Sequence, residues 1–589
     1  MIKLFCAIGA LALLAHDPAF AADTASQRLE RFAAEVHERV LDLFPVSETT
    51  GKGAGPRQDR LELTFSAAHR ERQRAHHLWV LQQLETIPIA ELTASETLTH
   101  QLLAYRTRDS LAWLAHPFHQ HFTFIQIDGG VAPNLIRLVQ RQPFRNEADY
   151  RAWFTRLGRY PEFIDGIATV MREGMTTGVT VPRVIVERAL PQVEALTPAE
   201  VEKSALWKPM TAFPDSIGSD VRSRLESEYR KILADGMYPA LRRLAAFVRD
   251  EYLLRTRTTD GLGALPNGAA MYRVAVQSET TTDMTPDEIH ALGLREVARI
   301  QDRLLAAGRS AGFEGPIRDV RAWVGSNPQN YPFASAEDVI AYLQQVHARI
   351  VPQLPELFSR LPKARLEIRP TDPVLAASTP AQWHPPSDDG TRPAIFFMPI
   401  VNAKTVSTFG LSSLLAHEGL PGHHMEGGIK LENEVPEFRR RFWVTSFGEG
   451  WALYAETLGH ALGLYEQPLE LMGRYASELF RACRLVVDTG LHAKGWTRQR
   501  AIAYLVEECA STEGNATLEV LRYMVWPGQA LSYKIGELTI LATRAKAEQR
   551  LGSRFDVRAF HDALLAEGHL PLSMMQQRMD AWIEEQANR

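Results

Sequence analysis

Apolar residues recur at three- and four-residue spacing along most of the chain, which is the pattern of amphipathic helices that bury one face. Two of these helices also carry start signals. Thr285 and Glu288 supply an N-cap and a capping-box acid ahead of 289–307, and Ser335 opens 339–350 in a similar way. The pattern therefore predicts a mainly α-helical protein, with further helices over 26–44, 95–116, 147–174 and 219–254.

Strand signals are few and confined to one region. Residues 365–369 alternate apolar and polar side chains, and 394–398 form a short apolar run. A loop rich in proline, serine and aspartate separates them, over 371–392. We expect a small β-sheet here, with 394–398 either an interior strand or an edge strand to which an extended peptide can add by main-chain hydrogen bonds.

The organisation of the chain favours one large helical unit over 23–589, because no repeat, low-complexity tract or long linker interrupts it. A softer division near residue 270 would separate an N-terminal helical lobe, 23–270, from a C-terminal lobe, 271–589. The residues with recognisable chemistry, described below, all lie in the second of these lobes.

The first residues have the features of an export signal. Lys3 precedes a short apolar run over 4–15, and small residues at 19–22 form a cleavage site. The run is shorter than the roughly 20 residues needed to span a bilayer. Cys6 lies inside the run, before the cleavage site, and is not expected to carry a lipid. We expect 1–22 to be removed and the mature protein to be periplasmic or secreted, without stable membrane insertion.

Charge and cysteine content exclude some classes of function. The 65 basic and 70 acidic residues leave a net charge of −5, and no lysine- or arginine-rich block is present, so nucleic-acid binding is disfavoured. After export, Cys483 and Cys509 remain. Export permits a disulfide, but we expect two buried thiols in a protein of this size. Neither cysteine lies in a CxxC or Cys-His arrangement, which argues against thiol catalysis.

The most informative stretch reads LLAHEGLPGHHME and contains His417, Glu418, His423 and His424. Two imidazoles and one carboxylate form a hydrolytic zinc site, which leaves one position open for water. In an unbroken helix the second histidine would stand four residues after His417, where Pro421 is found instead. A break at this proline would bring His423 to the required place, while an ideal helix would favour His424, so the spacing leaves both open.

The third ligand is expected from the run EGWALYAE, which begins at Glu449 and ends at Glu456. The two acids are seven residues apart and share a helical face. Glu449 is preferred, because the glycines on both sides of it allow a close approach to a metal. Glu456 would then accept a hydrogen bond from a ligand imidazole.

Four sequence blocks together carry a resemblance to a known family. They are HEGLPGH from His417, EGWALYAE from Glu449, RLVVDTGLH from Arg484 and PGQALSYKIG from Pro527. In these blocks, and over nearly all of the mature chain, the sequence resembles the bacterial DUF885 proteins, grouped with the zincin-like metallopeptidases. The resemblance implies a large helical zincin-like fold with a small β-sheet beside a deep active-site cleft. It also favours His423 over His424. One departure is Glu426, where the family often has glutamine.

The resemblance implies roles for several side chains. One zinc ion would be held by His417, His423 and Glu449, and Glu418 would be the general base rather than an ordinary solvated helix glutamate.

Arg484, Asp488 and His492 recur at four-residue intervals and share a helix face. Such a face is often only a set of surface salt bridges. In a cleft, Arg484 would hold a substrate carboxylate and His492 would donate to the developing oxyanion.

The last block contributes Tyr533 as a second oxyanion donor, with Gln529 and Lys534 as substrate contacts. The alternative is that Tyr533 packs in the core with its hydroxyl satisfied, and Tyr523 is a weaker candidate.

Together these residues predict an exported zinc-dependent metallohydrolase, and a peptidase that cleaves short peptides through a zinc-activated water is the leading hypothesis. A zinc hydrolase of a non-peptide amide or ester is one alternative, and a non-catalytic helical binding protein that retains the fold is another. The expected partner is a peptide or another small amide, and the expected cofactor is one Zn²⁺ ion.

Overall fold

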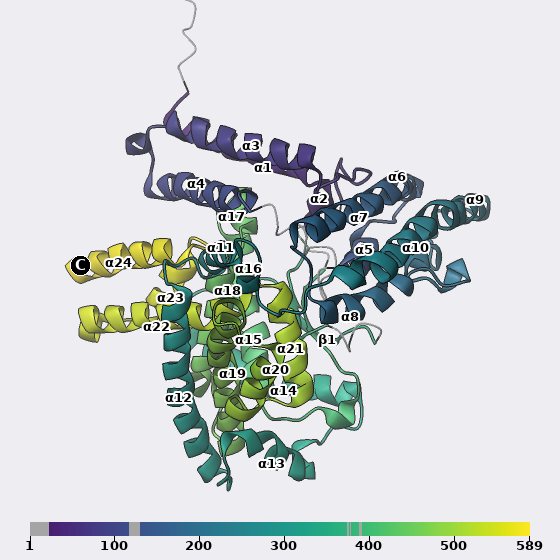
Figure 1. The fold of residues 1–589 in the computed structure, drawn as a ribbon. Helices are drawn as coiled ribbons and strands as arrows, with labels where there is room; N and C mark the ends of the chain where they lie inside the picture. The colour runs from purple at the N-terminus through teal and green to yellow at the C-terminus, as the bar shows by residue number, and fades with distance from the viewer. Residues whose placement is uncertain (1–22, 53, 117–129, 374–375, 377–378, 388–391) are drawn as a thin grey trace, which may run out of the picture.

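The computed structural model describes residues 23–589 apart from 53, 117–129, 374–375, 377–378 and 388–391 (Figure 1). The export signal predicted over 1–22 lies outside the described residues. The N-terminal half consists of α1 (Ala25–Leu43), α2 (Pro45–Lys52), α3 (Ala67–Glu85), α4 (Ala94–Leu114), α5 (Val131–Arg141), α6 (Glu147–Gly158), α7 (Tyr160–Thr177), α8 (Arg183–Glu194), α9 (Ser219–Lys231), α10 (Tyr238–Phe247) and α11 (Gly268–Thr280).

The C-terminal half adds a small sheet to a second set of helices. The helices are α12 (Pro286–Ser310), α13 (Val320–Ser326), α14 (Ala336–Ile350), α15 (Leu411–Glu418), α16 (His423–Glu432), α17 (Glu437–Arg441), α18 (Thr445–Thr457), α19 (Pro468–Ala493), α20 (Arg498–Glu508), α21 (Glu513–Val525), α22 (Ser532–Leu551), α23 (Val557–Leu565) and α24 (Leu572–Asn588). None of these described helices, in either half, is long and apolar enough to cross a membrane. The expected mainly helical fold with a small sheet is confirmed.

The predicted helix starts are confirmed at two positions. Thr285 and Glu288 form a complete capping box at the start of α12, and Ser335 forms one with Asp338 at the start of α14. The helix predicted over 147–174 is instead two helices, α6 and α7. The break falls next to Pro161, because proline lacks the N–H that would continue the α6 ladder.

The three strands form one sheet in the order β1–β3–β2. β1 (Leu366–Pro370) and β3 (Ala394–Met398) are the two predicted strands, and they pair in parallel. β2 (Gln382–His384) lies inside the predicted loop and pairs antiparallel with β3. β3 is therefore the interior strand, and the edge-strand alternative for 394–398 is wrong. β1 and β2 are the two edge strands.

Helices of distant sequence pack together around α18 and α19. Figure 1 shows α5 to α10 gathered on one side of the molecule and α22 with α24 on the opposite side. α19 packs along α12, and α18 packs along α22. The second pair is in close contact at Gly450 and Gly536, where a Cβ on Gly450 would lie 2.5 Å from the Gly536 Cα. Only glycine permits this separation, which sets how near α18 comes to α22.

Cys483 on α19 and Cys509 just beyond α20 form a disulfide, with Cα atoms 6.3 Å apart. The expectation of two free thiols is therefore wrong, although both residues are buried. α20 contacts α19 after a short connection, so two cysteines 26 residues apart in sequence meet between the helices. This pairing is a tertiary contact that the spacing of the cysteines did not reveal.

Replacing both cysteines with alanine should lower the free energy of unfolding by roughly 3 kcal/mol, because the disulfide no longer restricts the unfolded chain. Urea unfolding followed by circular dichroism measures the change. A thiol reductant should destabilise the unsubstituted protein and leave the double variant unaffected. An equal response of the two proteins to the reductant would contradict the disulfide.

Candidate metal centre

The chain interrupts its helix between the two candidate histidines. α15 ends at Glu418 and α16 begins at His423, so the break predicted from Pro421 is present. The turn is tight: a Cβ on Gly422 would lie 1.9 Å from the carbonyl oxygen of His417. Glycine is required at this position because any side chain would collide with the preceding helix. The imidazole rings of His417 and His423 consequently lie 5.0 Å apart, centroid to centroid.

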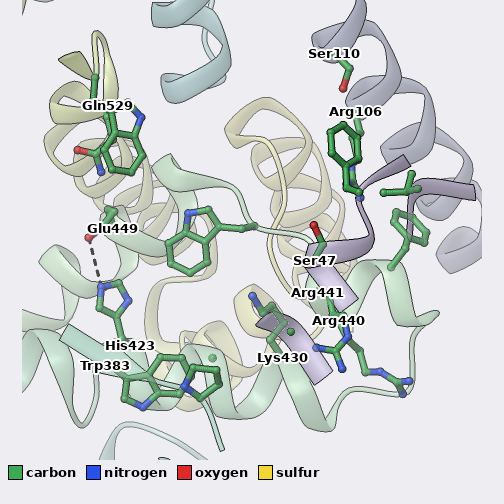
Figure 2. Close-up of a pocket in the computed structure, with 18 of the residues that line it drawn as sticks. Ser47, Arg106, Ser110, Trp383, His423, Lys430, Arg440, Arg441, Glu449 and Gln529 are labelled. Atoms are coloured by element: carbon green, nitrogen blue, oxygen red, sulfur yellow. Dashed lines mark ion pairs between the residues drawn. The ribbon is translucent and has the colours of Figure 1, made fainter. Parts of the chain in front are cut away.

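Glu449, in the second turn of α18, completes the group. Its Oε2 lies 3.5 Å from Nε2 of His417 and 3.4 Å from Nε2 of His423. Figure 2 shows His423 and Glu449 facing one another across the end of the pocket. One ligand atom from each of the three residues lies within 4.8 Å of the other two. The structure therefore brings together the three residues expected to bind zinc.

Neighbouring carboxylates hold both imidazoles from behind. Glu456 contacts Nδ1 of His417 at 3.0 Å, and Glu426 contacts Nδ1 of His423 at 3.4 Å. Burial raises the pKa of the Glu456 carboxyl, but the nearby arginine charge and the hydrogen bond with His417 outweigh this and lower it. An ionised carboxylate accepts the Nδ1–H of its imidazole and leaves the Nε2 lone pair facing Glu449. This is the role expected for Glu456.

Glu426 also contacts a residue that sequence reasoning missed. Its second oxygen lies 2.5 Å from Nε2 of His569, which precedes α24 and is fully buried. No motif marks His569, since it stands 143 positions away in the sequence. Glu426, which stands where the family often has glutamine, thus contacts two histidines.

His424, the alternative to His423, faces elsewhere. Its ring lies 6.2 Å from that of Trp383 in β2, and burial lowers its pKa to about 4. It does not line the pocket that contains His417 and Glu449. The geometry thus favours His423 over His424, because the break in the helix turns His423 toward Glu449.

The three side chains fit a zinc ion by the chemistry of their donor atoms. Two imidazole nitrogens and one carboxylate oxygen are the ligand set of hydrolytic zinc sites, which keep a further position for water. Burial raises the pKa of Glu449, but hydrogen bonds with His417 and His423 outweigh it and hold this pKa well below its usual range. Glu449 is therefore an anion at neutral pH, as a ligand carboxylate must be.

Glu418 lies at the same end of the pocket, directly after His417. Its side chain is buried and lines the cavity. Burial raises the pKa of this carboxyl, although the neighbouring histidines lower it in part. A carboxyl whose pKa is raised toward neutrality can both accept and release a proton, which is what a general base requires.

A cavity of about 1020 Å³ extends from this group. Tyr533 lines it, with its ring stacked 6.3 Å from that of His417. The Tyr533 hydroxyl accepts hydrogen bonds from Arg522 and Gln529, both at 3.3 Å. Because both contacts are donated to the oxygen, the hydroxyl hydrogen is left to donate to another group. Tyr533 and Gln529 therefore both line the cavity that contains the candidate metal ligands.

Arg484 also lines the cavity but is closely surrounded by protein. It donates to Tyr523 at 3.1 Å and to Glu519 at 3.0 Å. Its guanidinium carbon lies 4.4 Å from the centre of the Tyr533 ring. Arg484 thus supports the wall on which Tyr533 stands, and Tyr523 reaches the site only through it.

His492 does not reach the cavity, so the oxyanion role predicted for it is wrong. The Leu262 N–H donates to its Nδ1 at 3.0 Å, and its Nε2 contacts the Tyr523 carbonyl oxygen at 3.0 Å. Burial lowers its pKa to about 3, so the ring is neutral and both nitrogens are used by the backbone.

Lys534 is likewise a structural residue, and the substrate contact predicted for it is wrong. Its ammonium group is completely buried and pairs with Glu478 at 2.7 Å and with Glu537 at 2.5 Å. In an α-helix, residue 534 points about 100° away from residue 533, and Lys534 does not line the cavity that Tyr533 lines.

Asp488 is buried beneath the site. It accepts hydrogen bonds from the Tyr272 hydroxyl at 2.6 Å and from the Gly528 N–H at 3.1 Å. Burial raises its pKa to about 7 from an ordinary value of 3.8. Between these pH values the folded protein binds more protons than the unfolded chain, so its stability falls as pH rises.

Through Asp488, the free energy of unfolding of the unsubstituted protein should fall by up to about 4 kcal/mol as pH rises from about 4 to about 7. Asp488→Asn should abolish this fall, because the amide cannot ionise but keeps an acceptor for Gly528. Thermal unfolding of both proteins across this pH range measures the effect. Parallel pH profiles of the two proteins would show that Asp488 is not the group that titrates.

The comparisons with known proteins agree with this fold. A family model described as "Bacterial protein of unknown function (DUF885)" matches residues 46–579. A crystal structure from Colwellia psychrerythraea has a TM-score of 0.86 and 26% identity, and a structure from Shewanella oneidensis has 0.74 and 19%. Each alignment covers 95% of this chain and 100% of the other. Both proteins are described as putative lipoproteins, the second of unknown function. No match is found among curated proteins. The chain belongs to the DUF885 family of bacterial proteins.

Proposed function

We propose that this protein is an exported zinc-dependent hydrolase that cleaves short peptides. The observation that carries the proposal is the convergence of His417, His423 and Glu449 at one end of a large cavity, with Glu418 beside them. Two histidines and a carboxylate, backed by further carboxylates on both imidazoles, are typical of hydrolytic zinc enzymes.

Zinc, when bound by these three residues, lowers the pKa of a water molecule and polarises the carbonyl group to be attacked. Glu418 then takes the proton from the attacking water and later delivers it to the leaving amine. Its burial supports this assignment, because the raised pKa favours transfer in both directions. Glu456 and Glu426 keep the ligand imidazoles oriented throughout.

Tyr533 is proposed to donate its hydroxyl hydrogen to the oxygen on which negative charge develops. Arg522 and Gln529 hold the hydroxyl from behind, so the donor is in position before the reaction begins. A donor that needs no reorganisation is worth about 2.7–4 kcal/mol of transition-state stabilisation in comparable sites.

The shape of the site favours short peptides. A cavity of about 1020 Å³ is at the upper end of small-molecule sites and holds a few amino-acid residues. Gln382 and Trp383 of β2, an edge strand of the sheet, line it. An extended peptide beside this edge would gain main-chain hydrogen bonds while its side chains enter the cavity.

Export is supported by two observations. The structurally similar proteins are described as putative lipoproteins, which is consistent with a non-cytoplasmic, exported protein. The disulfide between Cys483 and Cys509 is also typical of proteins that fold outside the cytoplasm.

The mature protein, purified without chelator, should contain about one zinc ion per chain. His423→Ala should reduce the zinc content severely, because it removes one of the two imidazole ligands. His424→Ala is the matched control, since it removes a neighbouring buried histidine that faces away from Glu449. Inductively coupled plasma mass spectrometry gives the metal content. Equal loss in both variants, or no zinc after reconstitution, would contradict the proposed site.

Glu418→Gln should retain zinc and the fold but lower peptide hydrolysis by a factor of about 10²–10⁴, because the amide cannot accept the proton of the water. Release of amines from a mixture of short peptides, followed by mass spectrometry, measures the rate. Parallel incubation with non-peptide amides and esters tests the wider class of substrates. Unchanged hydrolysis in the variant would assign the activity to another group.

A further inference from the structure

Four basic side chains gather along the cavity at a distance from the candidate zinc ligands. They are Arg106 on α4, Lys430 on α16, and Arg440 and Arg441 on α17. Figure 2 shows Lys430, Arg440 and Arg441 together and Arg106 farther along, near Ser110, all on the side of the pocket away from Glu449 and Gln529. None of the four lies in the sequence blocks that identified the metal centre.

Lys430 is the most informative of the four. It is only 8% exposed, and its one hydrogen bond to a described residue is a long contact of 3.4 Å with the Phe442 carbonyl oxygen. No carboxylate in the described part of the chain lies within 4 Å of its ammonium group. Glu426 is the acid whose charge acts most on Lys430, but its carboxylate already contacts His423 and His569. Burial lowers the pKa of Lys430, and Arg441 lowers it further.

Arg106 and Arg440 share this lack of an acidic partner among residues that the structure describes. Arg106 projects into the cavity, where much of its surface is open, while the surrounding protein lowers its pKa. Arg441 differs, since it pairs with Glu437 at 3.2 Å.

Most other cations along the cavity wall have an acidic partner among the described residues, although Arg481 donates hydrogen bonds only to Ser477. Arg484 and Arg522 both contact Glu519, and Lys534 just behind them contacts three glutamates. Leaving a buried cation without a counter-charge costs free energy, so the protein pairs these groups. Lys430 is a buried exception, so an anion supplied by a ligand would be stabilised beside it.

Trp443 connects the basic side chains to the metal centre, because it contacts both Lys430 and His423. Its ring lies 6.1 Å from that of His423 and 5.2 Å from Nζ of Lys430. The distance from the His423 ring to Nζ of Lys430 is thus at most the length of about three residues of extended chain, at roughly 3.5 Å per residue. A substrate bound at the metal centre can therefore reach Lys430 with a group close to the bond that is cleaved.

We propose that Lys430, Arg440 and Arg106 form a subsite for a carboxylate of a short peptide substrate. The inference rests on the proposed function and specifies its substrate class. The carboxylate belongs either to an acidic side chain or to the peptide's C-terminus, and the two sources share the same chemistry. Arg441 contributes positive charge to the subsite while remaining paired with Glu437.

The test measures binding separately from turnover. Zinc-loaded Glu418→Gln protein is titrated calorimetrically with alanine tetrapeptides that carry glutamate or glutamine at each position, with a free or an amidated C-terminus. Each pair differs by one carboxylate and has nearly the same shape. The same titrations are made after adding Lys430→Met and Arg440→Gln together. Lys231→Met, on an exposed residue of α9 outside the cavity, is the matched control.

At least one carboxylate peptide should bind about tenfold or more tightly than its amide counterpart. Preference within a glutamate–glutamine pair assigns the subsite to a side chain, and preference for a free terminus assigns it to the C-terminal carboxylate. In the double variant the ratio of the Kd of the amide peptide to that of the carboxylate peptide should fall toward one. The Kd of the amide peptide should change by no more than about twofold. Lys231→Met should leave both values unchanged.

Equal affinity for every pair, or a preference that survives the double substitution, would overturn the subsite. Neither result bears on catalysis, since hydrolysis by the unsubstituted protein tests the proposed function independently. Zinc content and unfolding temperature are measured for each variant. If Lys430→Met does not fold, Arg106→Gln with Arg440→Gln replaces it, because both arginines are less buried than Lys430. This variant should show the same loss of preference for the carboxylate peptide over its amide counterpart.

Discussion

The close packing of α18 against α22 is the constraint on which the site depends. Gly450 and Gly536 let the two helices approach, and this places Glu449 of α18 and Tyr533 of α22 on the same cavity. Trp451, the next residue of α18, donates from its indole nitrogen to the Pro421 carbonyl oxygen at 2.9 Å. The helix is thereby fixed at once to α22 and to the turn that separates the two histidines. A bulkier residue at position 450 would push Glu449 away from both imidazoles.

Electrostatic pairing divides the interior into two kinds of region. Under the site, buried acids and bases are matched. Lys534 lies among Glu478, Glu537 and Glu296, and this group joins α12, α19 and α22. At the metal centre the acids exceed the bases, which suits a divalent cation, and near Lys430 the bases exceed the acids. A substrate with its carbonyl at the first region and a carboxylate at the second would complement both excesses of charge.

Sequence reasoning succeeded where the signal is local. Helix caps at Thr285 and Ser335 are short-range hydrogen bonds, and the break at Pro421 follows from the covalent structure of proline. What it missed depends on contacts between distant segments. β2 is too short to show alternation, and it exists because β3 offers it hydrogen bonds. The pairing of Cys483 with Cys509, the contact of His569 with Glu426, and the approach of Arg106 to the cavity all require the folded arrangement of helices.

The error at His492 shows the limit of arguments from a shared helix face. Arg484, Asp488 and His492 do lie on one side of α19, but each step of four residues also moves about 6 Å along the helix axis. The cavity ends near Arg484, so Asp488 and His492 lie progressively deeper, against Tyr272 and the backbone of Leu262. On an exposed helix a polar stripe meets water along its whole length. α19 is buried on nearly every side, so each polar group on the stripe needs its own protein partner. The stripe is therefore part of the site at one end and part of the core at the other.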